Sequence, residues 1–371
     1  MKTSIETYRS TKIIFLAAAL VTMSLADART IWFVGDHHEQ LTYDAMYCAD
    51  QLMPNEESCP PRPEDWKGEI DLSKVGLGKF TLAHAKNAVR YPDDPVRELR
   101  WWNLPGLVRW TWRIAVDACG SSDRIIDVKN GLRCSSHYGP LQFLHAMEEK
   151  ENVEPEVTRN KMSAWITFAL DVAQNKSNSE GVAFINQDYC SYWLASDSAI
   201  AEFMVPEADE FPCVKKGDPW TLGTIFSFDC RFKISSCWTD SDEQIRRRAI
   251  GAVLHLIQDS HSQGHSARGG CCGTTKTTDL AKFECAPIER FFVYKGQDRD
   301  RHTAADKAPI AGSSCNKTTE IHGPVLAAAH VLRMLSENVN RNQIVDYLNN
   351  HVIKTHVEAG LSSSTIGFDL Q

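Results

Sequence analysis

The sequence predicts an all-α fold, a single multi-helix domain with one irregular, disulfide-tied insertion. Two observations support this prediction. Apolar residues recur near the 3.6-residue period of a helix in several segments that contain few glycines or prolines. Residues 181–238 break that pattern, because they combine four cysteines with several aromatic residues and with glycine and Asp-Pro punctuation. Since no linker, repeat or low-complexity tract interrupts the chain, residues 29–371 form one predicted domain, with two domains as the alternative.

The helical period is clearest in four segments. Within one of them, Ile250, Val253 and Ile257 fall on one stripe, which is typical of a helix with a buried face. In another, Pro324 stands where the first turn of a helix tolerates proline, and an apolar, alanine-rich run follows it. The predicted helices are residues 38–53, 162–173, 245–257 and 324–335.

The first 28 residues have the pattern of a secretory signal peptide. Positive charges precede an apolar run from Ile13 to Leu25, and small residues at Ala26 and Ala28 fit a signal-peptidase site. The run is too short to span a bilayer, and no later segment approaches twenty uninterrupted apolar residues. We therefore expect a secreted protein, extracellular or in transit through a periplasm, with no transmembrane segment. An N-terminal hydrophobic anchor is the alternative.

The chain has twelve cysteines, all beyond the expected cleavage point. An even number of cysteines in an exported chain favours disulfides, whose pairing the sequence does not reveal. Zinc–thiolate ligation is the competing interpretation, but no Cys-x-x-Cys pair is present and the adjacent Cys271 and Cys272 make a poor chelating pair. The formal net charge of −8 argues against holding a nucleic-acid backbone by bulk charge, so recognition of phosphate would need a local cluster or metal ions.

The strongest chemical signal is the run HLIQDSHSQGH, residues 255–265. His255 and Asp259 are four residues apart on a predicted helix, so their side chains share one face and can meet one ion. His265 follows the expected helix end, where Gly264 allows the chain to turn back. Imidazole and carboxylate groups are suitable zinc ligands. The alternative is an ion-paired His–Asp couple on a solvated helix with incidental histidines.

Four further segments offer nitrogen and oxygen ligands. Each segment alone is also explained as a surface turn or a helix face, but together they could supply ligands for more than one metal ion. They are Asp36–Glu39 (DHHE), Tyr91–Pro95 (YPDDP), Ser136–Gly139 (SHYG) and His302–Asp306 (HTAAD).

These motifs resemble those of secreted bacterial zinc-dependent phospholipases C, which are related to S1/P1-type nucleases. The spacing His-x3-Asp-x5-His is shared by both groups, and the residues of the HLIQDSHSQGH sequence look closer to those of the phospholipases. The run HEQLT from His38, the turn at residues 92–95 and the run HYGPLQFLH from His137 are similar to other pieces of that family, and they occur in the same order. The resemblance spans most of the chain from Trp32 to Asp306, and it implies an all-α zinc phospholipase C / P1 nuclease fold.

The resemblance also implies two or three zinc ions and a set of ligands. One ion would take Asp93, His137, His255 and Asp259; a second His265, His302 and Asp306; a third Trp32 and His38, with Asp259 bridging. In the family a tryptophan that becomes the first residue chelates zinc, whereas the expected cleavage leaves Trp32 further inside. Asp94 could replace Asp93, and His37 competes with His38. His145 is interpreted as a satisfied core histidine, and His261 as an outer or surface residue.

The function that the resemblance implies is hydrolysis of the glycerol-side phosphodiester of phospholipids such as phosphatidylcholine. The products would be diacylglycerol and a phosphorylated headgroup, the partner a membrane or micelle surface, and no stable nucleic-acid complex is expected. Zinc would acidify water and hold phosphate oxygens, and Asp93 is the carboxylate expected to orient the attacking water. The rivals are an S1/P1-like single-strand nuclease on the same scaffold, a non-catalytic secreted zinc-binding protein, and a disulfide-rich surface-binding module.

Overall fold

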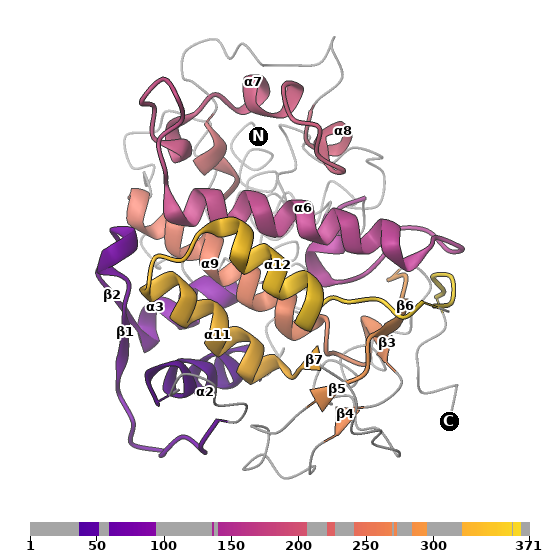
Figure 1. Cartoon of the computed structure of the whole chain (residues 1–371), viewed down its shortest axis with the longest axis horizontal. Helices are drawn as coiled ribbons and strands as arrows, with labels where there is room; N and C mark the ends of the chain where they lie inside the picture. The colour runs from indigo at the N-terminus through magenta and orange to yellow at the C-terminus, as the bar shows by residue number, and fades with distance from the viewer. Residues whose placement is uncertain are drawn as a thin grey trace, which may run out of the picture.

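The protein, seen as a computed structural model, is mostly helical (Figure 1). Helix α6 (Pro155–Gln174) and helix α9 (Asp242–Asp259) pack against each other at its centre. The remaining elements surround this pair, so the centre of the fold is a helix–helix interface. The structure describes residues 37–51, 59–93, 136, 140–205, 221–226, 241–268, 271–272, 284–294, 321–357 and 359–364.

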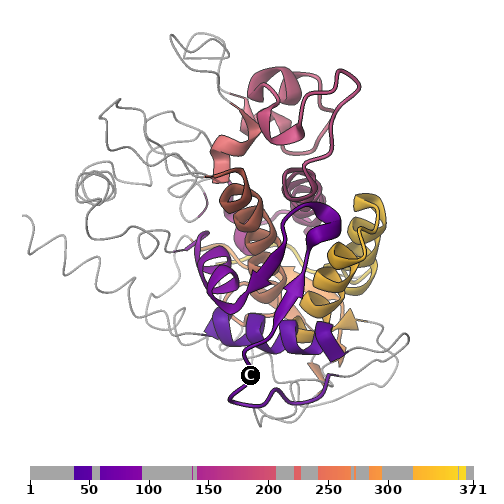
Figure 2. The ribbon, with the colours of Figure 1, turned by 90° about the vertical axis from the view of Figure 1, so that its left-hand side faces the viewer.

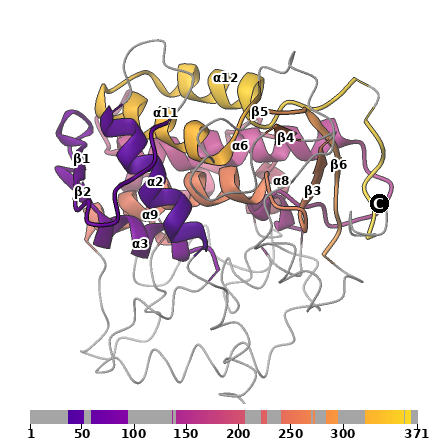
Figure 3. The same cartoon turned by 90° about the horizontal axis from the view of Figure 1, so that it is seen from below.

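Helix α9 is the most enclosed of the long helices. It begins with a capping box, in which the Ser241 side chain accepts from the Gln244 backbone N–H and the Gln244 side chain accepts from the Ser241 backbone N–H. From Ala249 to its last residue every side chain is buried. Helix α3 (Leu82–Arg90), α6 and α11 (Pro324–Ser336) cover it from different sides (Figure 3). A helix that is buried all round holds its side chains in fixed positions.

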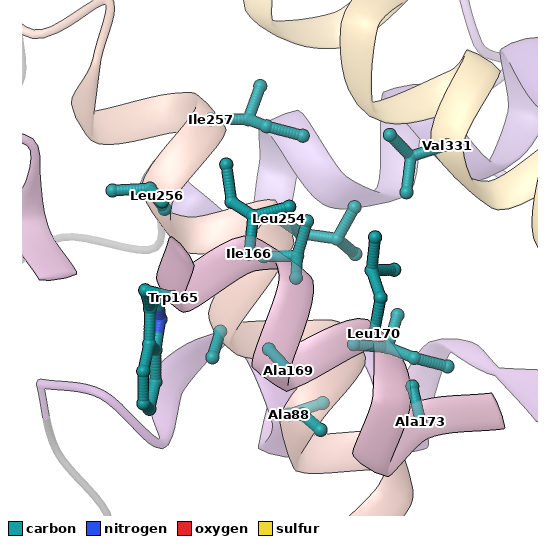
Figure 4. Close-up of a cluster of buried hydrophobic side chains, with 14 of the residues drawn as sticks. Ala88, Trp165, Ile166, Ala169, Leu170, Ala173, Leu254, Leu256, Ile257 and Val331 are labelled. Atoms are coloured by element: carbon teal, nitrogen blue, oxygen red, sulfur yellow. The ribbon is translucent and has the colours of Figure 1, made fainter. Parts of the chain in front are cut away.

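Apolar side chains fill the contact between these helices. Figure 4 shows Trp165 and Leu170 of α6 beside Leu254 and Ile257 of α9, with Val331 of α11 approaching from the far side. Each of these side chains is about 1 % exposed or less. Burial of each contributes about 1.5–3 kcal/mol to folding. The core therefore fixes α9 from Ile250 onward through apolar packing.

Gly251 sets the distance between α9 and α3. A Cβ atom built on Gly251 would lie 2.1 Å from the backbone carbon and oxygen of Ala88. Only glycine permits this approach, because the obstacle is backbone and not a flexible side chain. The close crossing brings the end of α3 against the C-terminal half of α9.

Helix α2 (His37–Gln51) packs against α11 and α3. A disulfide joins Cys48 near its end to Cys59, which confirms that at least one cysteine pair is bridged. Strands β1 (Glu69–Asp71) and β2 (Lys79–Thr81) then form an antiparallel hairpin that leads into α3 (Figure 2). The N-terminal part of the chain thus brings α2 and α3 to the same end of α9.

Short strands show that the all-α prediction was too simple. Strand β3 (Ser266–Arg268) pairs antiparallel with β6 (Ile288–Phe291). Strands β4 (Cys271–Cys272), β5 (Glu284–Cys285) and β7 (Ile321–His322) form a second small sheet. Strands of two to four residues cannot display a period of two over enough positions to be recognised in a sequence. The fold is mostly helical, with these sheets at the C-terminal end of α9.

The predicted irregular insertion contains only short helical elements where it is described. It contains η4 (Phe184–Asn186), α7 (Tyr189–Leu194), α8 (Ala201–Met204) and η5 (Leu222–Phe226). Cys190 within it is disulfide-bonded. Short helices tied by a disulfide agree with the expectation for this region.

All four predicted helices are present, and three of them both begin and end within three residues of the predicted bounds. The exception is α6, which begins earlier, with Pro155 in its first turn. Four helices among the described residues were not predicted as helices: α3, α12 (Arg341–His351) and, within the insertion, the short α7 and α8. Outside the insertion, two short turns also lie beyond the predicted helices, η1 (Ser73–Val75) and η3 (Gln142–His145). The predicted signal peptide lies outside the described residues. Within the described ranges, no helix combines the length and the hydrophobicity that a bilayer crossing requires.

Candidate metal centre

The last turn of α9 carries the predicted histidine–aspartate pair on one face. His255 Nε2 lies 3.0 Å from Asp259 Oδ2, as the i, i+4 spacing requires. His255 is 0 % exposed and Asp259 is 2 % exposed. A solvated helix face, the alternative weighed from the sequence, is therefore wrong for this pair.

Helix α2 contributes His38 from its first turn. His38 Nε2 lies 3.5 Å from Asp259 Oδ1, and its ring centre is 4.3 Å from that of His255. His38 is buried, whereas the neighbouring His37 is only half-buried. The structure thus favours His38 over His37 at the site.

Asp93 approaches His255 and His38 from the turn that follows α3. Its Oδ1 is 3.4 Å from His255 Nε2, and its Oδ2 is 3.9 Å from His38 Nε2. Two contacts hold the segment before it: Arg90 forms a buried ion pair with Glu39, and the Arg248 guanidinium lies 4.8 Å from the ring centre of Tyr91. Asp94, the alternative to Asp93, lies outside the described residues.

His145 is the residue that the sequence interpretation missed. It is buried, as a core histidine would be, but its Nδ1 lies 3.0 Å from Asp259 Oδ2, 3.1 Å from His255 Nε2 and 3.6 Å from Asp93 Oδ1. It ends the short turn η3, and Ala146 after it adopts the left-handed conformation at φ 52°. A non-glycine residue in this region is uncommon and often marks a functional site. His145 is buried, as expected of a core histidine, but its imidazole also belongs to the cluster, which the sequence interpretation did not anticipate.

His265 lies at the edge of this cluster. It is buried, its Nδ1 is 3.7 Å from Asp259 Oδ2, and the same nitrogen contacts the backbone carbonyl of His145. His261, expected to be an outer or surface residue, is also buried, with its Nδ1 2.8 Å from the Ile257 carbonyl oxygen of its own helix. His261 is therefore not on the surface, and this nitrogen faces the backbone.

Backbone and amide oxygens orient three of the imidazoles. His255 Nδ1 is 3.0 Å from the Val89 carbonyl oxygen, His38 Nδ1 is 2.8 Å from Gln258 Oε1, and His265 Nδ1 contacts the His145 carbonyl. An oxygen acceptor at Nδ1 favours the tautomer that leaves the Nε2 lone pair available. Metal-binding histidines in proteins typically have such a partner.

The electrostatics of the site favour a cation. Burial alone would raise the pKa of Asp259, but the positive charges of His255 and His265 hold it well below its usual value. Burial alone would likewise lower the pKa of His255, yet Asp259 and Asp93 hold it well above 6.5. Burial, followed by the charge of His255, lowers the pKa of His38. The two carboxylates therefore favour positive charge among the groups that surround them.

These residues fit a metal ion. Two overlapping groups, His38–Asp93–His255 and His145–His255–Asp259, have ligand atoms within 4.8 Å of one another. In the described part of the chain, every ion pair of Asp259 is with an imidazole. A divalent cation would balance both carboxylates, and mixed imidazole and carboxylate ligands suit zinc and related ions.

Several predicted ligands cannot be placed. Trp32, His137, His302 and Asp306 lie outside the described residues. Of the predicted set, the structure brings together His38, Asp93, His255, Asp259 and His265, and it adds His145. Comparison of the chain with protein-family models, with curated proteins and with solved structures gave no match.

Proposed function

We propose that the chain is a secreted zinc-dependent phosphodiester hydrolase, a phospholipase C of the family that its motifs resemble. One observation carries the proposal: separate segments of the chain bring imidazole and carboxylate groups into a single buried cluster. Its members are His38, Asp93, His145, His255 and Asp259. Clustered imidazole and carboxylate groups can hold the metal ions that promote phosphodiester hydrolysis.

Asp259 is suited to bridge two ions. Its Oδ1 faces His38, while its Oδ2 faces His145 and His255. Because the two oxygens of one carboxylate point toward different imidazoles, each oxygen could serve a different ion. This arrangement supports a centre of two or three zinc ions in the proposed enzyme.

Asp93 is the carboxylate best placed to handle the attacking water. Its side chain is 21 % exposed, whereas that of Asp259 is 3 % exposed, so Asp93 borders solvent. When bound, zinc would supply Lewis-acid polarisation of phosphate oxygens and would make water more acidic. Asp93 would orient that water and accept its proton. The water oxygen would bond to phosphorus, and the glycerol oxygen would leave with a proton as the hydroxyl of diacylglycerol.

A paired assay tests this proposal on the oxidised, full-length secreted protein. Zinc is quantified first, and phosphatidylcholine vesicles and single-stranded DNA are then offered separately, each with and without a chelator. We expect bound zinc and chelator-sensitive release of diacylglycerol, with the DNA left intact. Asp259→Asn should lose both zinc and activity, whereas Asp50→Asn, an exposed carboxylate on α2, should retain both.

Each other outcome would change the assignment. Loss of DNA instead of lipid would move the function to the nuclease branch on the same scaffold. Bound zinc without either activity would favour a zinc-binding protein. Absence of zinc, or full zinc and full activity in Asp259→Asn, would contradict the proposed centre.

A further inference from the structure

Gln258 connects the cluster on α9 to helix α2. Its Oε1 is 2.8 Å from His38 Nδ1, and its Nε2 donates to Thr42 Oγ1 at 2.8 Å. The Thr42 hydroxyl in turn donates to the His38 carbonyl oxygen at 2.7 Å. All three residues are 8 % exposed or less. The result is a closed ring of hydrogen bonds behind the imidazole of His38.

The direction of these bonds can be worked out from the number of hydrogens. A threonine hydroxyl has one hydrogen, and Thr42 uses it on the His38 carbonyl. Thr42 can therefore only accept from Gln258, which turns the amide NH2 toward Thr42 and the amide oxygen toward His38. An amide oxygen only accepts, so His38 Nδ1 must be the donor. The reverse amide orientation would leave the buried Oε1 without a donor, which costs about 1–3 kcal/mol.

We propose that Gln258 is a positioning residue that fixes His38 in the tautomer with its proton on Nδ1. The lone pair on Nε2 then faces Asp93 and Asp259, at 3.9 Å and 3.5 Å. The inference rests on the proposed function in one respect, since it gives His38 the role of a metal ligand. Gln258 also immediately precedes Asp259, so one turn of α9 supplies a ligand and the group that orients another.

Substitutions separate this role from simple packing. Gln258→Leu keeps a similar shape but removes the acceptor, whereas Gln258→Glu keeps an acceptor oxygen toward His38. Thr42→Val keeps the shape of threonine but removes the hydroxyl that fixes the amide orientation, and Thr42→Ser retains it. We expect the Ser variant to behave like the parent protein. The Glu variant should keep the proton of His38 on Nδ1 although it loses the bond to Thr42, and the Leu and Val variants should differ.

The first test is the tautomer of His38 in metal-free protein with 15N-labelled histidine. Long-range proton–nitrogen NMR spectra distinguish a protonated Nδ1 from a protonated Nε2, and His38→Gln identifies the relevant signals. We expect the Nδ1–H form in the parent protein and in Gln258→Glu, and a mixed or reversed population in Gln258→Leu and Thr42→Val. An Nε2–H form in the parent protein, or an unchanged tautomer in both Leu and Val variants, would overturn the proposal.

The second test is zinc affinity, measured by competition with a chromophoric chelator. Loss of such an orienting partner weakens metal binding by about 10- to 100-fold, and we expect this loss in Gln258→Leu with recovery in Gln258→Glu. Equal affinity in Gln258→Leu and the parent would count against the positioning role. A parent protein with the Nδ1–H tautomer but no zinc would support the tautomer assignment and contradict the proposed function. Zinc binding with the opposite tautomer would contradict the inference alone.

Discussion

The buried side chains toward the C-terminal end of α9 divide into two halves that lie among different kinds of groups: an apolar half, which includes Ile250 and Leu254, and a polar half, His255 and Asp259. In the apolar half, Leu254 packs into the contact with neighbouring helices (Figure 4), and Ile250 belongs to the same hydrophobic core. In the last turn, His255 and Asp259 are just as inaccessible but face other ionisable side chains. Burial of apolar surface stabilises the fold, whereas burial of a carboxylate is unfavourable unless charge and hydrogen bonds compensate it.

Apolar packing and the buried polar groups have different roles in the fold. The apolar half holds α9 rigidly, and that rigidity keeps the imidazole and carboxylate groups of the polar half in fixed positions. A bound cation would balance the charge of the buried carboxylates in the polar half. The two halves should consequently respond differently to mutation, metal and pH.

The largest effect should come from the apolar half. Leu254→Ala removes a fully buried side chain at the helix contact and should lower the free energy of unfolding by about 2–5 kcal/mol. Chemical denaturation with and without a chelator measures this loss, which should be similar in both conditions. Leu194→Ala is the control, because Leu194 is 69 % exposed and its loss should change stability by less than about 0.5 kcal/mol. A loss seen only with zinc would contradict the division between the halves.

The polar half should respond to metal. Free zinc at one hundred times its dissociation constant should raise the free energy of unfolding by about 2.7 kcal/mol, because the ion binds the folded protein alone. Asp259→Asn should abolish this increase, since it removes the carboxylate that faces three of the imidazoles. Thermal unfolding with added zinc measures the effect, and Asp50→Asn should leave it intact. Stabilisation of Asp259→Asn by zinc to the same extent would rule out this site.

Gly251→Ala tests the close crossing of α9 with α3, which supports both halves. Alanine ordinarily favours a helix over glycine by about 1 kcal/mol, but here the new methyl group would overlap the backbone of Ala88. We expect a net destabilisation of about 1–3 kcal/mol, as in other overpacked cores. Zinc affinity should fall as well, because α3 carries both the Val89 carbonyl and the approach to Asp93. A stabilised variant with unchanged zinc affinity would show that the close crossing is unimportant.

The apolar half of the comparison could largely be predicted from the sequence. The stripe of Ile250, Val253 and Ile257 predicted α9, because helical periodicity is a local property of the chain. The i, i+4 spacing of His255 and Asp259 was equally informative, since a helix fixes that geometry by itself. The preference for His38 over His37 came from the helical frame of the residues that follow it, and the structure places His38 in the cluster.

His145 could not be recognised in this way. It lies in a short apolar segment that resembles a core element, and it is 110 residues away from His255 in the chain. Its role depends on the packing of η3 against α9, which no local pattern reports. The left-handed backbone of Ala146 marks this turn, but an alanine gives no sign of that conformation in the sequence. Helix α3 carried a local signal, the Thr81 cap before an alanine-containing segment, which could have been used.

The smallest effect concerns pH, which should change the metal-free and metal-bound proteins in opposite directions. Burial would lower the pKa of His255, but Asp259 and Asp93 hold it well above 6.5. A raised pKa contributes stability that is complete below the unfolded-state value and is lost as pH rises through the folded-state value. Zinc must displace the same proton, so its affinity should increase with pH by up to about tenfold per unit, or about 1.4 kcal/mol, while His255 is protonated.

Unfolding measured from about pH 6.5 upward, once with a chelator and once with zinc, separates the two trends. The metal-free protein should lose stability as pH rises, whereas the stabilisation by zinc should grow and then level off. His255→Gln should flatten the trend of the metal-free protein, because it removes the group that titrates. Parallel trends in the two states would mean that proton and metal do not compete at His255, and the ion would then have to bind through other residues.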